Sequence, residues 1–416
     1  MTSNFLKYTV TAALLMAAVV VLGQNKSAGV NLSLWNKIAT QPLNNKQKTF
    51  LNLGVQSKQN RLQGLSINLI GSSTLDSAKG IQLGGWSTMT GDNSYGVNVA
   101  GLLTVNAIHT YGLTAGGLAS IVGESQHGVV VAGLFNFIGI DNKGVAIAGL
   151  GNLGGYNSLG ITLGGLANIY GEDVIGITIA GLFNSSESIR GVGFAGLVNT
   201  TDQVRGFTFA PINRNTQNYW GLQAGVLNIN RENFKGAQIG LINSSVHHHG
   251  LQLGVINYYK EQMKGVQLGL VNIHKNTIYD LLLYGGNHTK MNFALRFKNN
   301  LFYNIVGVGA PFLQFKDKFS GALNYRTGIH IPLGHFIDLS SDIGFSHINT
   351  FQSRQKDIPK RMYALEYRLS TEYIPSSKWS LILTGGYHTT RRYSQSSTYK
   401  KGFIIEAGIA HRLSFK

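Results

Sequence analysis

The amino-acid sequence predicts an all-β protein, a β-solenoid of about 14 coils followed by an eight-stranded antiparallel β-barrel. Three observations predict this fold class. A glycine-led unit recurs every 14 to 16 residues through the middle of the 416-residue chain. Segments of nine to sixteen residues alternate apolar and polar side chains through the last third. Charged residues make up only 13% of the chain and hydrophobic residues 43%, a balance that argues against disorder.

Residues 1–23 have the pattern of a signal peptide. Lys7 precedes an apolar run, Thr9–Leu22, and the small residue Gly23 is followed by polar residues. The run is shorter than the ~20 apolar residues of a membrane-spanning helix. We therefore expect the chain to be exported, with an uncleaved membrane anchor as the alternative. Residues 24–63 are expected to form a leader or cap that contains a degenerate unit, GVNLSLWN, at 29–36.

Residues 64–277 contain the repeat, which predicts the solenoid. Early units read GVVVAGLFN (128–136) and late units read GVQLGLVN (265–272). Their first halves alternate apolar residues, as at Val266, Leu268 and Leu270, and this pattern predicts a strand. One unit cannot bury its own apolar face, so neighbouring units are expected to stack. The fourteen units begin at Gly64, Gly80, Gly96, Gly112, Gly128, Gly144, Gly160, Gly176, Gly191, Gly206, Gly221, Gly236, Gly250 and Gly265.

Asparagine ends the apolar half of ten units. Stacked amides can hydrogen-bond to one another and to the turn backbone, so this column is predicted to be a structural ladder rather than a ligand site. Alternatively, each unit is one strand of a large antiparallel pore. The uniform connections of six or seven residues disfavour the pore, because barrels alternate short and long loops. The ladder residues are Asn136, Asn152, Asn168, Asn184, Asn199, Asn213, Asn228, Asn243, Asn257 and Asn272.

Residues 278–416 are predicted to form an outer-membrane-type β-barrel. Eight segments alternate strictly and are as long as the ~9–11 residues that cross a bilayer. The connections alternate between long and short, as in barrels with short periplasmic turns. An even strand count places both barrel ends, and therefore the repeats, in the periplasm. The repeats would lie at the surface only if they threaded the barrel or if the strand count were odd. Eight strands leave little room for a channel, and five inward charges are expected to pair there: Glu366, Arg368, Glu372, Glu406 and Arg412.

The repeat units, with the leader GVNLSLWN and the segment TFLNLGV, resemble the bacterial surface repeat-containing proteins with G-V-x-x-A-G-L-x-N units. The match covers about residues 29–273. The resemblance implies an exported protein at the cell surface and no established biochemical activity. The C-terminal part resembles outer-membrane β-barrels generally. Such barrels usually end in an aromatic residue, whereas here Lys416 follows Phe415.

Catalytic and metal-binding motifs are not evident in the sequence. The chain has no cysteine, no P-loop, no GxSxG and no HExxH, and no acidic column recurs, so neither enzymatic activity nor a cofactor is expected. The run His247–His249 suggests either a metal site or a solvated turn; the turn is favoured because consecutive strand residues point to opposite faces.

Basic residues are concentrated in the C-terminal part, where 18 Lys and Arg stand against 8 Asp and Glu. Basic loops at an outer rim suit lipopolysaccharide headgroups, an anionic glycan or an acidic envelope protein, and they equally serve solubility and anchoring at the lipid interface. Export disfavours nucleic acid as a partner. The basic loop residues are Arg354, Lys356, Lys360, Arg361, Arg391, Arg392, Lys400 and Lys401.

These observations predict a non-enzymatic protein of the outer membrane or cell envelope. A repeat solenoid would carry a structural or binding role, and the C-terminal barrel would anchor it. The first alternative is a transport protein in which the repeats are strands of one large outer-membrane pore. The second is a secreted adhesin whose C-terminal part is a soluble β-sandwich.

Overall fold

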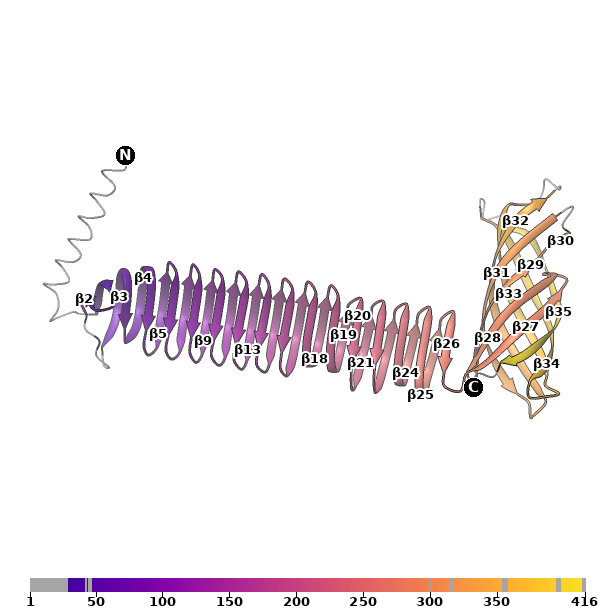
Figure 1. Ribbon diagram of the computed structural model, residues 1–416, viewed down its shortest axis with the longest axis horizontal. Coiled ribbons are helices and arrows are strands. Elements are labelled where there is room, and N and C mark those ends of the chain that lie inside the picture. The colour runs from indigo at the N-terminus through magenta and orange to yellow at the C-terminus, as the bar shows by residue number, and fades with distance from the viewer. Residues whose placement is uncertain are drawn as a thin grey trace. The chain divides into compact units, whose positions relative to one another are not determined.

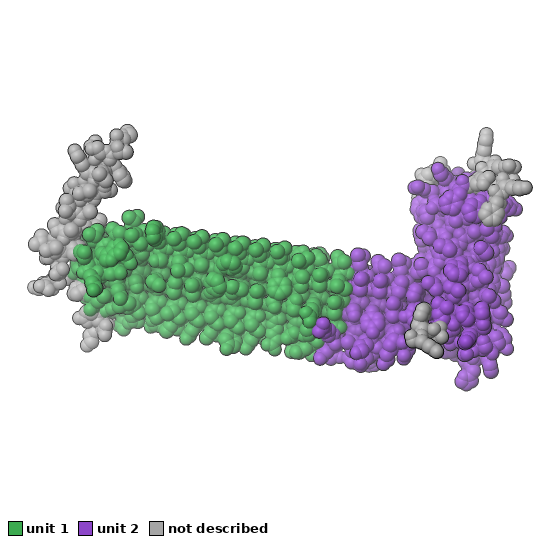
Figure 2. All heavy atoms as spheres, viewed as in Figure 1, with its two compact units in different colours: residues 1–230 green, residues 231–416 purple. Residues whose placement is uncertain are grey.

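The computed structural model describes residues 29–41, 43, 47–299, 301–314, 318–353, 358–393 and 398–413. The signal peptide predicted for residues 1–23 lies outside these residues. The chain divides into two compact units, residues 1–230 and 231–416 (Figure 2). The described residues are all-β (Figure 1), and no helix among them is long and apolar enough to cross a membrane.

The repeats form a solenoid whose coils each contain a longer and a shorter strand or, in some coils, one strand that continues into the next coil. Together the strands make one 26-stranded sheet system. The strands are β1 (Val30–Trp35), β2 (Ile38–Ala39), β3 (Lys48–Gln59), β4 (Arg61–Thr74), β5 (Ala78–Gly84), β6 (Ser87–Thr90), β7 (Ser94–Ala100), β8 (Leu103–Asn106), β9 (Thr110–Gly116), β10 (Ala119–Val122), β11 (Gln126–Ala132), β12 (Phe135–Ile138), β13 (Asn142–Ala148), β14 (Gly151–Gly154), β15 (Ser158–Gly164), β16 (Ala167–Tyr170), β17 (Asp173–Ala180), β18 (Phe183–Ala195), β19 (Val198–Phe209), β20 (Ile212–Asn215), β21 (Tyr219–Ala224), β22 (Leu227–Asn230), β23 (Asn233–Ile239), β24 (Ile242–Leu253), β25 (Ile256–Leu268) and β26 (Val271–His274).

Equivalent residues of neighbouring coils pair in parallel and in register. Gly128 of β11 is opposite Gly144 of β13, and Asn136 of β12 is opposite Asn152 of β14. The degenerate leader unit joins the same stack, because β1 pairs in parallel with β3. Parallel pairing of unit on unit confirms the solenoid. It also shows that the repeats are not strands of one large antiparallel pore.

The solenoid buries polar side chains and exposes apolar ones. Val266, Leu268 and Leu270, whose alternation predicts the strand, are 36%, 40% and 42% exposed, whereas Gln267 between them is 8% exposed. The expectation that stacking buries the apolar face is therefore wrong for these coils. Two strands per coil leave a thin interior that fits small residues such as Ala132 and Ala148, together with amides and hydroxyls that bond to one another.

The C-terminal strands form a closed antiparallel barrel of eight strands, which confirms the prediction. The ring follows β27, β28, β29, β31, β32, β33, β34 and β35, and β35 pairs with β27 to close it. A soluble sandwich is excluded by this closure. The strands are β27 (Ile278–Gly286), β28 (Met291–Asn299), β29 (Phe302–Ala310), β30 (Leu313–Gln314), β31 (Lys318–Pro332), β32 (Ile337–Ser353), β33 (Arg361–Tyr373), β34 (Trp379–Arg392) and β35 (Thr398–Leu413); β30 is a short addition paired with β31.

The barrel wall is apolar outside and polar inside. Along β33, Leu365 and Leu369 face outward while Glu366, Arg368 and Glu372 are buried in the lumen. Strand β28 alternates in the same way. Trp379 and Tyr373 are exposed near the short turns, and Tyr387, Tyr393 and Phe403 are exposed near the long loops. Apolar outer walls with aromatic residues at both ends are typical of barrels that face lipid.

Candidate functional site

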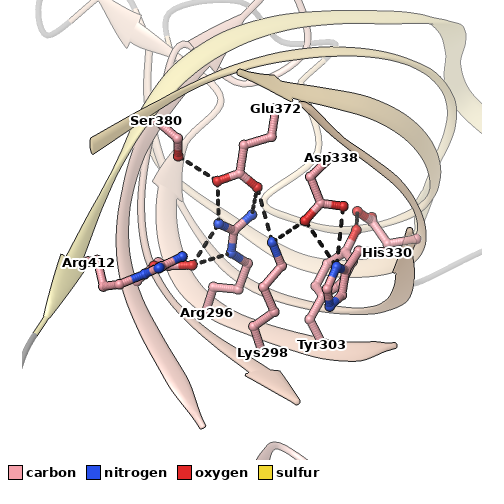
Figure 3. A network of polar contacts seen from close by, with 10 residues as sticks. Arg296, Lys298, Tyr303, His330, Asp338, Glu372, Ser380 and Arg412 are labelled. Atoms are coloured by element: carbon pink, nitrogen blue, oxygen red, sulfur yellow. Dashed lines mark hydrogen bonds and ion pairs between the residues drawn. The ribbon is translucent and has the colours of Figure 1, made fainter. Parts of the chain in front are cut away.

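Buried ion pairs fill the barrel lumen near the short turns (Figure 3). Arg296 donates to Asp280 at 2.7 Å and to Glu372 at 2.7 Å, so one guanidinium bridges two carboxylates. Lys298 lies 2.5 Å from Asp338 and 3.4 Å from Glu372. The network is extended by three further side chains, namely Ser380, which donates to Glu372, His330, which lies 3.0 Å from Asp338, and Arg412, which lies 3.6 Å from Asp280.

Two more ion-pair groups occupy the lumen towards the long loops. Arg326 pairs with Asp342 at 2.6 Å, and Arg368 bridges Glu366 at 2.5 Å and Glu406 at 3.0 Å. The inward charges predicted from the sequence therefore do pair, although Glu372 and Arg412 bond to partners that sequence reasoning did not identify. Six charged residues of the lumen were missed, and all stand on the inward face of strands whose alternation is visible in the sequence: Asp280, Arg296, Lys298, Arg326, Asp338 and Asp342.

Buried side chains fill the middle of the lumen. A cluster of buried side chains that includes Leu282, Tyr284 and Ile305 closes the middle of the barrel. The cavity beside this cluster has a volume of about 20 Å³, room for about one water molecule. An ion or solute would have to displace paired charges and packed side chains in order to cross.

A cavity at the long-loop end of the barrel has a volume of about 590 Å³. We call it the mouth cavity. Lys290, Lys318 and Lys400 line it, and its described lining contains no carboxylate. The other lining residues are Asn287, His288, Pro311, Phe312, Leu313, Gln314, Ile348, Met362, His388, Thr390 and Tyr399.

The mouth cavity combines cations with an apolar floor. Ile348 and Met362 are fully buried members of one hydrophobic cluster. Phe312 and Tyr399 pack against this cluster. The Lys318 ammonium lies 4.9 Å from the centre of the Phe312 ring, which helps to hold that ring in place. Such a lining suits an anion that carries an apolar part. Of the basic loop residues predicted from the sequence, Lys400 lines the cavity, whereas Arg354 and Lys356 lie outside the described residues.

The predicted asparagine ladder lies inside the solenoid, where all ten residues are buried. Asn152 donates to the Asn168 side chain at 2.8 Å and to the Leu163 carbonyl at 2.8 Å. Side-chain bonds of this kind join Asn136 through Asn228 in sequence order, and likewise Asn243, Asn257 and Asn272. Each of these bonds joins two coils, and most of the amides also donate to a backbone carbonyl near the end of a strand, an arrangement that stabilises the stack of coils.

A glutamine ladder in the late coils was not predicted. Gln267 donates to Gln252 at 2.7 Å, and Gln252 donates to Gln238 at 2.8 Å, all three buried. The sequence carries a signal for it, because these residues stand two positions after the unit glycines Gly236, Gly250 and Gly265.

His247, His248 and His249 lie within strand β24 rather than in a turn, so the solvated-turn prediction is wrong. His248 is fully buried and its ring stacks on Phe234 at 4.8 Å, while His247 lies 3.3 Å from Glu261. Burial lowers the pKa of His248 to about 4, and the neighbouring His249 adds to this effect. The described residues include no group of three or more histidines and carboxylates placed to hold a metal ion.

No protein-family model matches the chain, and no curated protein matches it. The resemblance of the units to the surface repeat-containing proteins therefore stays a prediction. Among solved structures, the chain is similar to Ail, the attachment invasion locus protein of Yersinia pestis, with 14% sequence identity and a TM-score of 0.19. The similarity covers 33% of this chain and 95% of Ail. Because the TM-score is this low, we argue neither fold nor function from Ail.

Proposed function

We propose that the chain is a non-enzymatic outer-membrane protein whose closed barrel is an anchor and whose solenoid carries a structural or binding role. The observation that supports this best is the polarity of the barrel, with an apolar outer wall around a lumen of paired charges. In water this arrangement would expose Phe403 at 77% and Leu383 at 63% of their surfaces. In a bilayer the same side chains face hydrocarbon, and closure satisfies the strand backbone.

The anchor does not conduct. The ion pairs around Arg296 and the cluster around Tyr284 block the lumen, so transport through this barrel is not expected. With eight strands, both barrel ends lie on the same side of the membrane. Short turns are typical of the periplasmic side of such barrels, and this supports a periplasmic location of the solenoid in our proposal.

Surface proteolysis on intact cells tests this proposal. One tag is placed in the repeats near Asn230 and another in the loop at 389–399. We expect cleavage of the loop tag and protection of the repeat tag, with the protein retained in membranes after carbonate extraction. Cleavage of both tags would place the repeats at the surface, and extraction by carbonate would support a secreted adhesin. Steady conductance in planar bilayers would contradict the closed lumen.

A second function, binding of an anionic ligand at the long-loop end, is supported by the mouth cavity. Three lysines converge there over an apolar floor, and no described carboxylate lines the space. Lipopolysaccharide has phosphate groups and acyl chains that suit such a lining. An anionic glycan or an acidic envelope protein would use the cations alone.

The test compares the K290Q/K400Q variant with K378Q, which removes an exposed lysine near the short turns. Binding of labelled lipopolysaccharide to the barrel in detergent is expected to fall about tenfold for the double variant and to stay unchanged for K378Q. Equal affinities in both variants would show that the mouth cavity does not bind this ligand.

A further inference from the structure

In the units from Gly96 to Gly191, the solenoid has an apolar edge that consists of one turn and the two flanks that meet at it. Counting the unit glycine as position one, the outward positions are two and four on one flank, seven at the turn, and eight and ten on the other flank. In the six units from Gly96 through Gly176 none of these positions is charged. The turn position forms a column that we call the leucine edge: Leu102, Leu118, Leu134, Leu150, Leu166, Leu182 and Leu197.

The leucine edge is exposed, yet the backbone N–H and carbonyl groups of its leucines are hydrogen-bonded. All its members except Leu150 are 40% to 49% exposed. The Leu134 N–H donates to the Leu118 carbonyl at 2.8 Å, and the Leu166 N–H donates to the Leu150 carbonyl at 2.7 Å; the same bond recurs along the edge. Surfaces that enter hydrocarbon must satisfy their backbone groups internally, and the leucines of this turn do so.

The depth of the apolar surface fits one leaflet of a bilayer. From Val129 at position two to Leu134 at position seven the chain advances five residues. At a rise of ~3.3 Å per residue the advance is about 16 Å. One leaflet contributes about 15 Å of the ~30 Å hydrocarbon core.

The column that borders this surface, at the last position of each unit (sixteen in the longer units and fifteen in the shorter ones), has the composition of a membrane interface. We call it the rim column: Lys79, Tyr95, Tyr111, His127, Lys143, Leu159, Ile175, Arg190, Arg205 and Trp220. Tyr95 stacks on Tyr111 at 4.9 Å, and the Arg205 guanidinium lies 4.6 Å from the Trp220 ring. Basic and aromatic side chains favour the headgroup level, where the cations complement anionic phosphates.

We propose that the leucine edge inserts into one phospholipid leaflet of the membrane that the barrel spans, with the rim column at the headgroups. The proposal rests on the proposed outer-membrane location. The units from Gly96 to Gly191 thus form a monotopic element that lies in the leaflet, and their acidic turn residues, such as Glu124 and Glu172, remain in water.

A lipid leaflet fits this surface better than a protein partner does. The apolar residues cover two flanks and the edge between them, so a protein would need a deep groove that wraps around the edge. Protein interfaces also carry about one hydrogen bond per 100–200 Å², whereas the apolar positions of the six units contain a single polar side chain, Ser185. Acyl chains wrap around an edge without needing hydrogen bonds.

Site-specific fluorescence quenching on the full chain tests the proposal. Because the chain contains no cysteine, Leu134→Cys, Glu172→Cys and Leu383→Cys each give one labelling site, on the leucine edge, in the opposite turn and on the outer wall of the barrel. Each variant is labelled with bimane and refolded into vesicles of phosphatidylethanolamine and phosphatidylglycerol. The quenchers are an acyl-chain nitroxide lipid and aqueous iodide, and the far-ultraviolet circular dichroism of each variant checks its fold.

We expect the nitroxide lipid to quench residues 134 and 383 at least threefold more than residue 172, and iodide to quench residue 172 most. If residue 383 meets lipid while residue 134 is quenched by iodide like residue 172, the inference fails and the barrel anchor stands. Shielding of residue 134 from both quenchers would show that protein covers the edge, which also overturns the inference. If residue 134 meets lipid and residue 383 does not, the leucine edge enters lipid without the barrel, which overturns both the barrel anchor and the inference that the two share one membrane.

Discussion

The solenoid and the barrel are both apolar outside and polar inside, but they satisfy their buried polar groups in different ways. Both expose apolar residues, such as Leu134 in the solenoid and Leu383 in the barrel, and both bury polar ones. The barrel interior uses charges, with Arg296 held between Asp280 and Glu372. The solenoid interior uses neutral amides that repeat from coil to coil. A parallel in-register stack places like residues side by side, so a column of like charges would repel itself, whereas an amide both donates and accepts.

The largest expected effect follows from breaking a buried ion pair of the barrel. Arg296→Met leaves Asp280 and Glu372 without their shared cation and should reduce the free energy of unfolding by about 3–5 kcal/mol. Urea unfolding in vesicles, followed by the mobility shift of the folded barrel in gels, measures it. The matched variant is Arg61→Met, which breaks the exposed pair with Asp76 in the solenoid and should cost under about 1 kcal/mol. Equal losses in the two variants would contradict the contrast between the regions.

A methyl group added at a unit glycine tests how closely the coils approach. Gly176 has φ +125°, and a Cβ there would lie 2.1 Å from the Gly160 carbonyl oxygen. Gly176→Ala should therefore destabilise the solenoid by about 2–4 kcal/mol through backbone strain and overpacking. Gly385→Ala in the barrel meets nothing within 4 Å and should be neutral. Hydrogen exchange of the peptides around each site measures both, and a neutral Gly176→Ala would show that the coils can separate.

Acid should weaken the solenoid locally at His248. Its pKa falls from 6.5 to about 4 in the folded chain, so between these values the unfolded state binds the extra proton. The stability contributed by neutral His248 is present above pH 6.5 and is lost as the pH falls towards 4, by roughly 2–3 kcal/mol. Hydrogen exchange of the peptide at 242–253 should therefore rise at pH 5 relative to the barrel peptides. His248→Phe, which keeps a ring against Phe234, should remove this difference; its persistence would assign it to another group.

The sequence predicts the strands and the stacking of this fold better than it predicts which face is buried. Unit glycines and alternating segments mark where strands lie, and inward charges such as Glu366 and Arg368 follow from the barrel alternation. Alternation defines two faces without saying which one a thin two-strand coil encloses, so Gln267 was missed as an interior residue. The mouth cavity was missed as well, because Lys318 and Lys400 meet there only after the barrel closes.

The smallest expected effect is the difference in stability lost when an asparagine is removed from the middle of the ladder or from its beginning. Asn168 accepts from Asn152 and donates to Asn184 and to the Ile179 carbonyl, whereas Asn136 donates to Asn152 and to the Ile147 carbonyl. Asn168→Ala should cost about 1–3 kcal/mol, because both neighbouring amides lose a buried partner. Asn136→Ala should cost less, because only one neighbouring amide of the ladder, Asn152, loses a partner. Hydrogen exchange in the units on either side of each site compares them. Equal effects would mean that each amide stabilises only its own coil and that the bonds between the amides add no stability.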